Sequence, residues 1–148
     1  MSVTIRPVTC EDEPVWRQLW SDYLAFYNTA LPAAVYAQTF RRMVERDHPG
    51  PYGLLAERDG VVVGLVHYLF HRSGWKIEDV CYLQDLFVAP EARGTGAGRA
   101  LIEAVYAEAD RAGAPSVYWL TQEFNYAGRM LYDRVGVKSP FIRYGRPT

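Results

Sequence analysis

The chain of 148 residues has little of what marks a secreted or membrane protein. It has only two cysteines, Cys10 and Cys81, which are too few for a disulfide scaffold or for a metal site of four thiolates. No apolar run approaches the roughly 18 residues that a membrane span needs. The first residues also lack the apolar stretch of a signal peptide. The sequence therefore predicts a reduced, cytoplasmic protein with no membrane partner.

An excess of charge of one sign is also lacking. The formal net charge is −1, which argues against nucleic acid as a partner. A local anion site stays possible, because backbone amides at a helix N-terminus bind phosphate without net positive charge. Aromatic residues, by contrast, are abundant at 14% of the chain, with 11 Tyr and 4 Trp. This abundance indicates an aromatic pocket or an oligomer interface.

The spacing of apolar residues predicts one α/β domain with a mixed sheet over residues 1–148. Asp59-Gly60 between two apolar runs predicts a hairpin. The element order is β-α-α-β-β-β-α-β-α-β. The expected strands are 3–8, 52–58, 61–70, 80–88, 117–121 and 141–144, and the expected helices are 9–28, 33–46, 96–112 and 125–135.

A glycine-rich loop after the strand at 80–88 is the most informative segment. It reads Arg93-Gly94-Thr95-Gly96-Ala97-Gly98-Arg99 and opens a long helix. Glycines let an anion approach the backbone amides without meeting a Cβ, and the helix dipole adds positive potential. We therefore expect a phosphate or pyrophosphate here. A P-loop does not fit, because Arg99-Ala100 stands where Lys-Ser/Thr is required, and a dinucleotide fingerprint matches weakly, since Arg99 replaces its third glycine.

In its context this loop resembles the cofactor motif of the GNAT superfamily of acetyl-CoA-dependent N-acetyltransferases. The resemblance rests on Arg93-x-x-Gly96-x-Gly98 after Leu86-Phe87-Val88-x-Pro90, and on Asn125 placed seven residues before Tyr132. It covers nearly the whole chain, and residues 82–88 are most similar to the spermidine/spermine-type and fungal histone-acetyltransferase-like branches. It implies a mostly antiparallel, twisted sheet of six to seven strands with about four helices. It also implies a homodimer formed in part by the tail strand at 141–144.

The resemblance further implies which residues meet acetyl-CoA. The pantetheine arm would pair with the backbone of Leu86, Phe87 and Val88. Asn125 would touch the cofactor and Tyr132 would lie near its sulfur. The pyrophosphate would lie on the loop amides of Arg93, Gly94, Thr95, Gly96, Ala97, Gly98 and Arg99.

Acetyl transfer to an amine needs a base and an acid. A lysine-like amine loses its proton at pH 7 at a cost of roughly 4.6 kcal/mol, and the leaving thiolate needs a proton, for which Tyr132 is the expected donor. Relatives usually carry Glu where Gln84 stands, and glutamine cannot titrate, so Asp85 is the next candidate base. Adjacent strand residues face opposite sides, so Gln84 and Asp85 line one pocket only if a bulge intervenes.

Other candidates are weaker. His67 and His71 are titratable but are expected to be ordinary strand residues, and Cys81 is expected to be a buried thiol. The helical stripe of Trp16, Trp20, Tyr23 and Tyr27 is expected to pack in the core, with the wall of an acceptor pocket as its alternative role.

The sequence thus predicts a transferase that passes acetyl to a primary amine, on a small molecule or a protein lysine, by direct attack in a ternary complex without a metal. Gln84 in place of a carboxylate keeps a noncatalytic acyl-CoA-binding or sensor domain open as the alternative. An acyltransferase for a longer acyl group is a second alternative.

Overall fold

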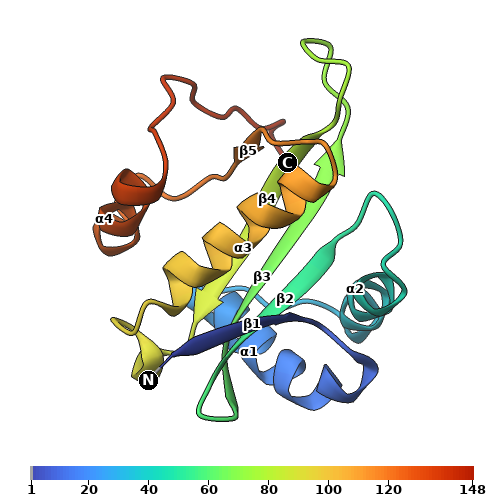
Figure 1. Ribbon diagram of the computed structural model, residues 1–148, viewed down its shortest axis with the longest axis vertical. Helices are drawn as coiled ribbons and strands as arrows, with labels where there is room; N and C mark the ends of the chain where they lie inside the picture. Colours follow the sequence, from blue (N-terminus) through green and yellow to red (C-terminus); the bar gives the residue numbers. More distant parts are fainter. Residues whose placement is uncertain (1) are drawn as a thin grey trace.

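A single five-stranded sheet organises the computed structural model, which describes residues 2–148 (Figure 1). Neighbouring strands are antiparallel except β4 and β5, which run parallel, so the predicted mixed sheet is confirmed. The predicted hairpin is also present, and Asp59 and Gly60 both adopt positive φ at its turn. In chain order, which is also their order in the sheet, the strands are β1 (Val3–Pro7), β2 (Tyr52–Arg58), β3 (Val61–His71), β4 (Val80–Val88) and β5 (Val117–Tyr118).

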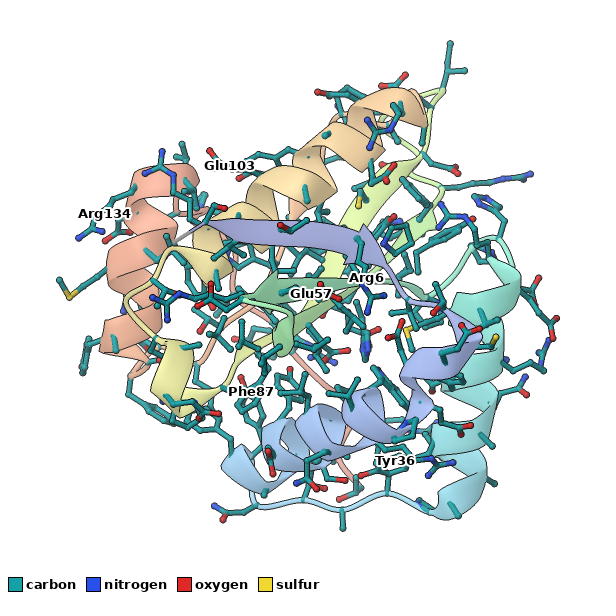
Figure 2. All side chains as sticks on the ribbon, turned by 60° about the horizontal axis from the view of Figure 1, so that its bottom comes forward. Arg6, Tyr36, Glu57, Phe87, Glu103 and Arg134 are labelled. Atoms are coloured by element: carbon teal, nitrogen blue, oxygen red, sulfur yellow. The ribbon has the colours of Figure 1, made fainter. Side chains whose placement is uncertain are left out.

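The structure has four α-helices: α1 (Glu13–Phe26), α2 (Ala33–Glu45), α3 (Ala97–Arg111) and α4 (Tyr126–Val135). The first three cover the two faces of the sheet, and α4 lies beside α3 (Figure 1). Figure 2 shows α1 and α2, in blue and cyan, on one face and α3, in orange, on the other. Apolar residues spaced three or four apart make this possible, since they line one side of a helix. No helix within residues 2–148 is long and apolar enough to cross a membrane.

Each face has its own core. On the α1 and α2 side, Trp16 is fully buried and packs with Phe40 and Leu65. On the α3 side, Leu101 and Val105 pack against the strands. The expectation that Trp16 and Trp20 belong to the core is confirmed, whereas Tyr23 and Tyr27 of the same stripe stay partly exposed.

The sheet has five strands rather than the six to seven expected. The predicted strand at 141–144 is wrong, because Phe141, Ile142 and Tyr144 remain 80%, 79% and 86% exposed and pair with no strand of residues 2–148. The predicted strand at 117–121 is too long, because β5 ends at Tyr118. An apolar alternating sequence forms a strand only where a neighbouring backbone offers hydrogen bonds, and here the chain departs from β4.

Two irregularities of β4 shape the region around it. The register of β3 with β4 pairs His67 with Asp85 and Tyr68 with Leu83, so Gln84 is the extra residue of a β-bulge. On the other edge, β4 pairs with β5 only at Cys81 and Tyr82. The two parallel strands therefore separate after Tyr82, and residues 83–88 present a backbone edge toward the gap.

Candidate active site

The loop between β4 and α3 presents a row of unpaired backbone N–H groups. Within residues 2–148, the amides of residues 94–99 donate no hydrogen bond, and Ala100 donates the first bond of α3, to the Gly96 carbonyl. Gly94 and Gly96 have φ of 80° and 88°, and a Cβ at either would meet nothing within 4 Å. Glycine is thus required by the left-handed backbone, and the space above the loop is open. Such a row at a helix N-terminus fits an anion.

Gly98 has a different role from the two preceding glycines. A Cβ at Gly98 would lie 3.2 Å from Cδ2 of Leu131, so the small residue lets α3 approach α4 closely. Ala97 beside it is buried. Residues 97 and 98 therefore shape the helix packing under the loop as well as contributing amides to it.

Two arginines flank the loop. Arg93 donates from Nε to the Val88 carbonyl at 3.2 Å, and its guanidinium lies over the ring of Phe87. Arg99 pairs with Glu103 one turn further along α3, with 3.5 Å between Nε of the arginine and Oε2 of the glutamate. Thr95 turns its hydroxyl back to donate to the Ala92 carbonyl and steadies the turn. An arginine therefore stands at each end of the loop. Glu103 offsets the charge of Arg99, so it is the Arg93 end that favours a ligand with negative charge.

A narrow cavity occupies the gap where β4 and β5 separate. Its walls come from α1, β4, α3, α4 and the segment that begins with β5: Tyr23, Tyr27, Leu83, Gln84, Leu86, Ile102, Trp119, Leu120, Thr121 and Tyr132. The cavity thus brings Gln84, Leu86 and Tyr132 together, as the sequence-based assignment required.

Tyr132 lies half-buried in the wall of the cavity. Trp119 packs edge-on against its ring, with 5.7 Å between the ring centroids. Burial, and to a smaller extent the neighbouring Tyr27, raises the pKa of the Tyr132 phenol above its usual value. The hydroxyl therefore keeps its proton at neutral pH and can give it to a stronger base.

Asn125 caps the helix that carries Tyr132. Its side-chain oxygen accepts from the Gly128 amide at 3.3 Å, and its nitrogen donates to the hydroxyl of Thr121 at 3.0 Å. Thr121 lines the cavity. Asn125 therefore stands beside the cavity, with both ends of its amide group engaged within the protein.

The β-bulge separates the two candidate base positions. Gln84 is exposed at the bulge and lines the cavity. Asp85 turns its carboxylate under α1, where Tyr23 donates to Oδ1 at 2.9 Å and His67 Nδ1 lies 3.0 Å from Oδ2. The bulge that sequence reasoning required is present, but Asp85 reaches the cavity only through Tyr23.

The remaining candidates lie elsewhere. His71 is exposed and binds the hydroxyl of Tyr118 at 2.8 Å. Cys81 is a free, buried cysteine, as expected, and burial raises the pKa of its thiol to about 12. Sequence reasoning missed the polar role of Tyr23, which it placed in an apolar stripe. The signal was its phenol oxygen, because a tyrosine among tryptophans in a core needs a hydrogen-bond partner.

Comparison with known proteins agrees with this geometry. The model of the Acetyltransferase (GNAT) family matches residues 13–137. The D-amino-acid N-acetyltransferase HPA3 of Saccharomyces cerevisiae is 37% identical over 97% of this chain and 90% of its own. The uncharacterized N-acetyltransferase YhfO of Bacillus subtilis is 28% identical over 96% of this chain and 95% of its own. The solved structure of AAC(6')-Iy with a bisubstrate analogue superposes with a TM-score of 0.82 over 100% of both chains at 20% identity, which shows a shared fold.

The family match spans more than half of the chain, and the yeast relative aligns with nearly all of it. Both agree with the loop, the cavity and the separated strands. The chain therefore belongs to the acetyltransferase (GNAT) family and is an N-acetyltransferase that takes its acetyl group from acetyl-CoA.

Proposed function

We propose that the enzyme acetylates small primary amines, with D-amino acids as the first acceptor class, by direct attack in a ternary complex. One observation supports this best: the row of unpaired amides at 94–99 and the cavity with Tyr132 adjoin the same free edge of β4. A diphosphate on the loop would direct an extended arm along that edge. The acceptor class is taken from the yeast relative, which is named a D-amino-acid N-acetyltransferase.

Acetyl-CoA would bind mainly to backbone groups of the protein in this region and less to side chains. The diphosphate would accept hydrogen bonds from the amides of residues 94–99, with the side chains of Arg93 and Arg99 nearby. The amide of Arg93, expected from the sequence to join this row, donates instead to the Pro90 carbonyl at 3.3 Å. The pantetheine arm would pair with Leu86, Phe87 and Val88 in the place that β5 leaves. Asn125 would contribute where its amide meets Thr121 at the cavity wall.

Tyr132 would act as the general acid. The raised pKa of its phenol keeps it protonated at neutral pH, so the proton is in place when the thiolate leaves. Its position on the cavity wall, opposite Gln84 and Leu86, suits a sulfur delivered along β4. The attacked thioester carbon would then lie between Tyr132 and the bulge.

Asp85 would be the final acceptor of the amine proton, and Gln84 would contribute a hydrogen bond without titrating. This division follows from chemistry, because a carboxylate can act as a base toward a bound ammonium group and a carboxamide cannot. It also removes the main support for a noncatalytic sensor, since a carboxylate lies one residue beyond the position that glutamine occupies.

We also propose a cytoplasmic homodimer. Phe141, Ile142 and Tyr144 are exposed at the end of the chain, and exposed apolar residues in a row mark an interaction surface. Sedimentation measures this directly. A concentration-independent dimer that becomes a monomer when Phe141 and Ile142 are changed to serine supports the proposal, whereas a wild-type monomer contradicts it.

The decisive experiment is an acceptor panel. Thiol release from acetyl-CoA is followed with D-amino acids, L-amino acids, polyamines, aminoglycosides and lysine peptides. We expect the highest kcat/KM with D-amino acids. Turnover confined to another class refutes the acceptor assignment, and CoA binding without turnover of any amine refutes direct acetyl transfer.

A further inference from the structure

A buried hydrogen-bonded chain fixes the carboxylate of Asp85. His67 faces Oδ2 at 3.0 Å and Tyr23 donates to Oδ1 at 2.9 Å. The His67 side chain is 2% exposed and that of Asp85 is 14% exposed. Both carboxylate oxygens therefore have a directed partner, and the carboxylate has one orientation, in a setting where solvent screens little.

Trp16 determines the tautomer of His67. The indole N–H of Trp16 is a donor only, and it lies 3.0 Å from Nε2 of His67. Nε2 must therefore be the acceptor, and the proton of the neutral ring lies on Nδ1, where it is donated to Asp85. A proton on Nε2 would face the indole N–H inside a core where Trp16 is 0% exposed. His67 is thus a neutral donor and is not the base.

Tyr23 joins this chain to the cavity. Its hydroxyl donates to Asp85, and the residue lines the cavity together with Gln84 and Tyr132. A phenol oxygen that donates one hydrogen bond can still accept another. Burial first, and then the charge of Asp85, raises the pKa of Tyr23 far above its usual range. The phenol therefore keeps one proton on average, and it can accept a proton only while it passes its own to Asp85.

We propose that Tyr23 relays the proton of the acceptor ammonium to Asp85, and that His67 and Trp16 are positioning residues for this relay. The inference rests on the proposed function, because it assumes an amine in the cavity. As the ammonium N–H bond breaks, an O–H bond forms on Tyr23 and the former Tyr23 proton moves to Oδ1 of Asp85. The products are a neutral amine and a carboxylic acid, with no charge on Tyr23.

The later protons also balance. Attack of the amine on the thioester leaves a positively charged nitrogen, whose proton replaces the one that Tyr132 gives to the thiolate. Asp85 returns its proton to water through Tyr23 after the product has left. The titratable groups that face Asp85 and Tyr23 are His67 of β3, Tyr27 directly after α1 and Tyr82 of β4. The indole N–H of Trp16 faces Nε2 of His67 and leaves the proton of that ring on Nδ1.

The test compares Tyr23→Phe with a matched control. Tyr36→Phe removes a phenol hydroxyl from the same aromatic layer, where it binds Ser21 away from the cavity. With the best D-amino acid of the panel, we expect Tyr23→Phe to lower kcat/KM about 100-fold at pH 7. The difference in kcat/KM between Tyr23→Phe and the wild type should become smaller as pH rises, because more of the acceptor then binds as the free amine and does not need the relay. Tyr36→Phe keeps the wild-type profile, and calorimetry shows unchanged CoA binding for both variants.

Residues that act in series give losses that do not add. Asp85→Asn alone and Tyr23→Phe/Asp85→Asn together are therefore expected to match Tyr23→Phe within a few-fold. Additive losses, or a Tyr23→Phe deficit that is the same at every pH, overturn the relay. Absence of turnover in the wild-type enzyme overturns the proposed function instead, and the relay with it.

The positioning role has its own readout. Asparagine can place an N–H near the site of Nδ1, whereas leucine cannot, so His67→Asn is expected to keep the wild-type pH profile and His67→Leu to shift its acidic limb upward with about a tenfold lower kcat. Equal profiles for the two variants contradict the positioning role. Nitrogen-15 spectra of His67 should show the tautomer with its proton on Nδ1, and a proton on Nε2 contradicts the chain independently of activity.

Discussion

The two functional regions that meet at β4 are built in opposite ways. The loop presents the backbone amides of residues 94–99, and its conformation is set by glycines within a few residues of one another. The Asp85 side presents hydrogen-bonded side chains: Trp16 and His67 are 51 positions apart in the sequence, and Tyr23 and Asp85 are 62 apart. A site made of backbone amides tolerates many side-chain substitutions but few changes of backbone conformation. A series of hydrogen-bonded side chains, by contrast, is sensitive to the loss of a single atom.

The largest effect is expected where the two regions meet, at Tyr132. Tyr132→Phe removes the proposed proton donor and keeps the ring, so kcat should fall roughly 100- to 1,000-fold. The loop is untouched, so the affinity for CoA should stay at the wild-type value. Tyr126→Phe on the same helix is the matched control, because Tyr126 is exposed. Steady-state kinetics and calorimetry measure both quantities, and a Tyr132→Phe enzyme with unchanged kcat would remove the residue from the acid role.

The next effect concerns a polar cluster that, unlike the Asp85 chain, is mostly local. Asp12 accepts from the Thr9 amide at 2.7 Å and from both terminal nitrogens of Arg6, and Arg6 also reaches Glu57 (Figure 2). The hydrogen bonds from Arg6, above all, lower the pKa of Asp12 to about 2. A lowered folded-state pKa stabilises the fold above the ordinary value of 3.8, and this stabilisation is lost as pH falls through about 2.

Asp12→Asn should therefore lose about 2 kcal/mol of unfolding free energy at pH 7. The loss should shrink toward pH 2, and urea denaturation at several pH values measures it. Acetyl transfer per folded molecule should not change, because the cluster lies at the start of the chain away from the cavity. A loss of the same size at pH 2 and pH 7 would contradict the assignment of the charge to Asp12.

A substitution that disturbs the backbone of the loop is expected to have a somewhat smaller effect. Gly96→Val forces a β-branched residue into a φ of 88°, which costs roughly 1–2 kcal/mol and obstructs the amides. Gly113→Val is the matched control, because Gly113 has φ of 71°, open space around it and a place at the far end of α3. Both variants should lose similar stability, but only Gly96→Val should lose about tenfold in CoA affinity. Equal CoA affinity in the two variants would show that the loop is not the diphosphate site.

The features that the sequence could predict, and those that it could not, divide in the same way between local backbone patterns and long-range side-chain contacts. The loop, the hairpin at Asp59-Gly60 and the mixed sheet depend on short-range patterns, and all three are present. The Trp16–His67–Asp85–Tyr23 chain joins α1 to β3 and β4, and no local pattern records that contact. The tail at 141–144 has the pattern of a strand but finds no partner strand among residues 2–148, so periodicity alone predicted too many strands.

The smallest expected effect is the contribution of the Trp16 hydrogen bond to stability, measured apart from the contribution of its side-chain volume. Trp16 and Trp20 are both buried on α1 and stack on each other, but Nε1 of Trp20 has no partner within residues 2–148 whereas that of Trp16 donates to His67. Replacing either by phenylalanine removes a similar volume. Only Trp16→Phe also leaves Nε2 of His67 unpaired, so it should destabilise the fold by about 1 kcal/mol more than Trp20→Phe. Urea denaturation measures the difference, and equal losses would mean that the indole N–H contributes nothing to holding His67 in place.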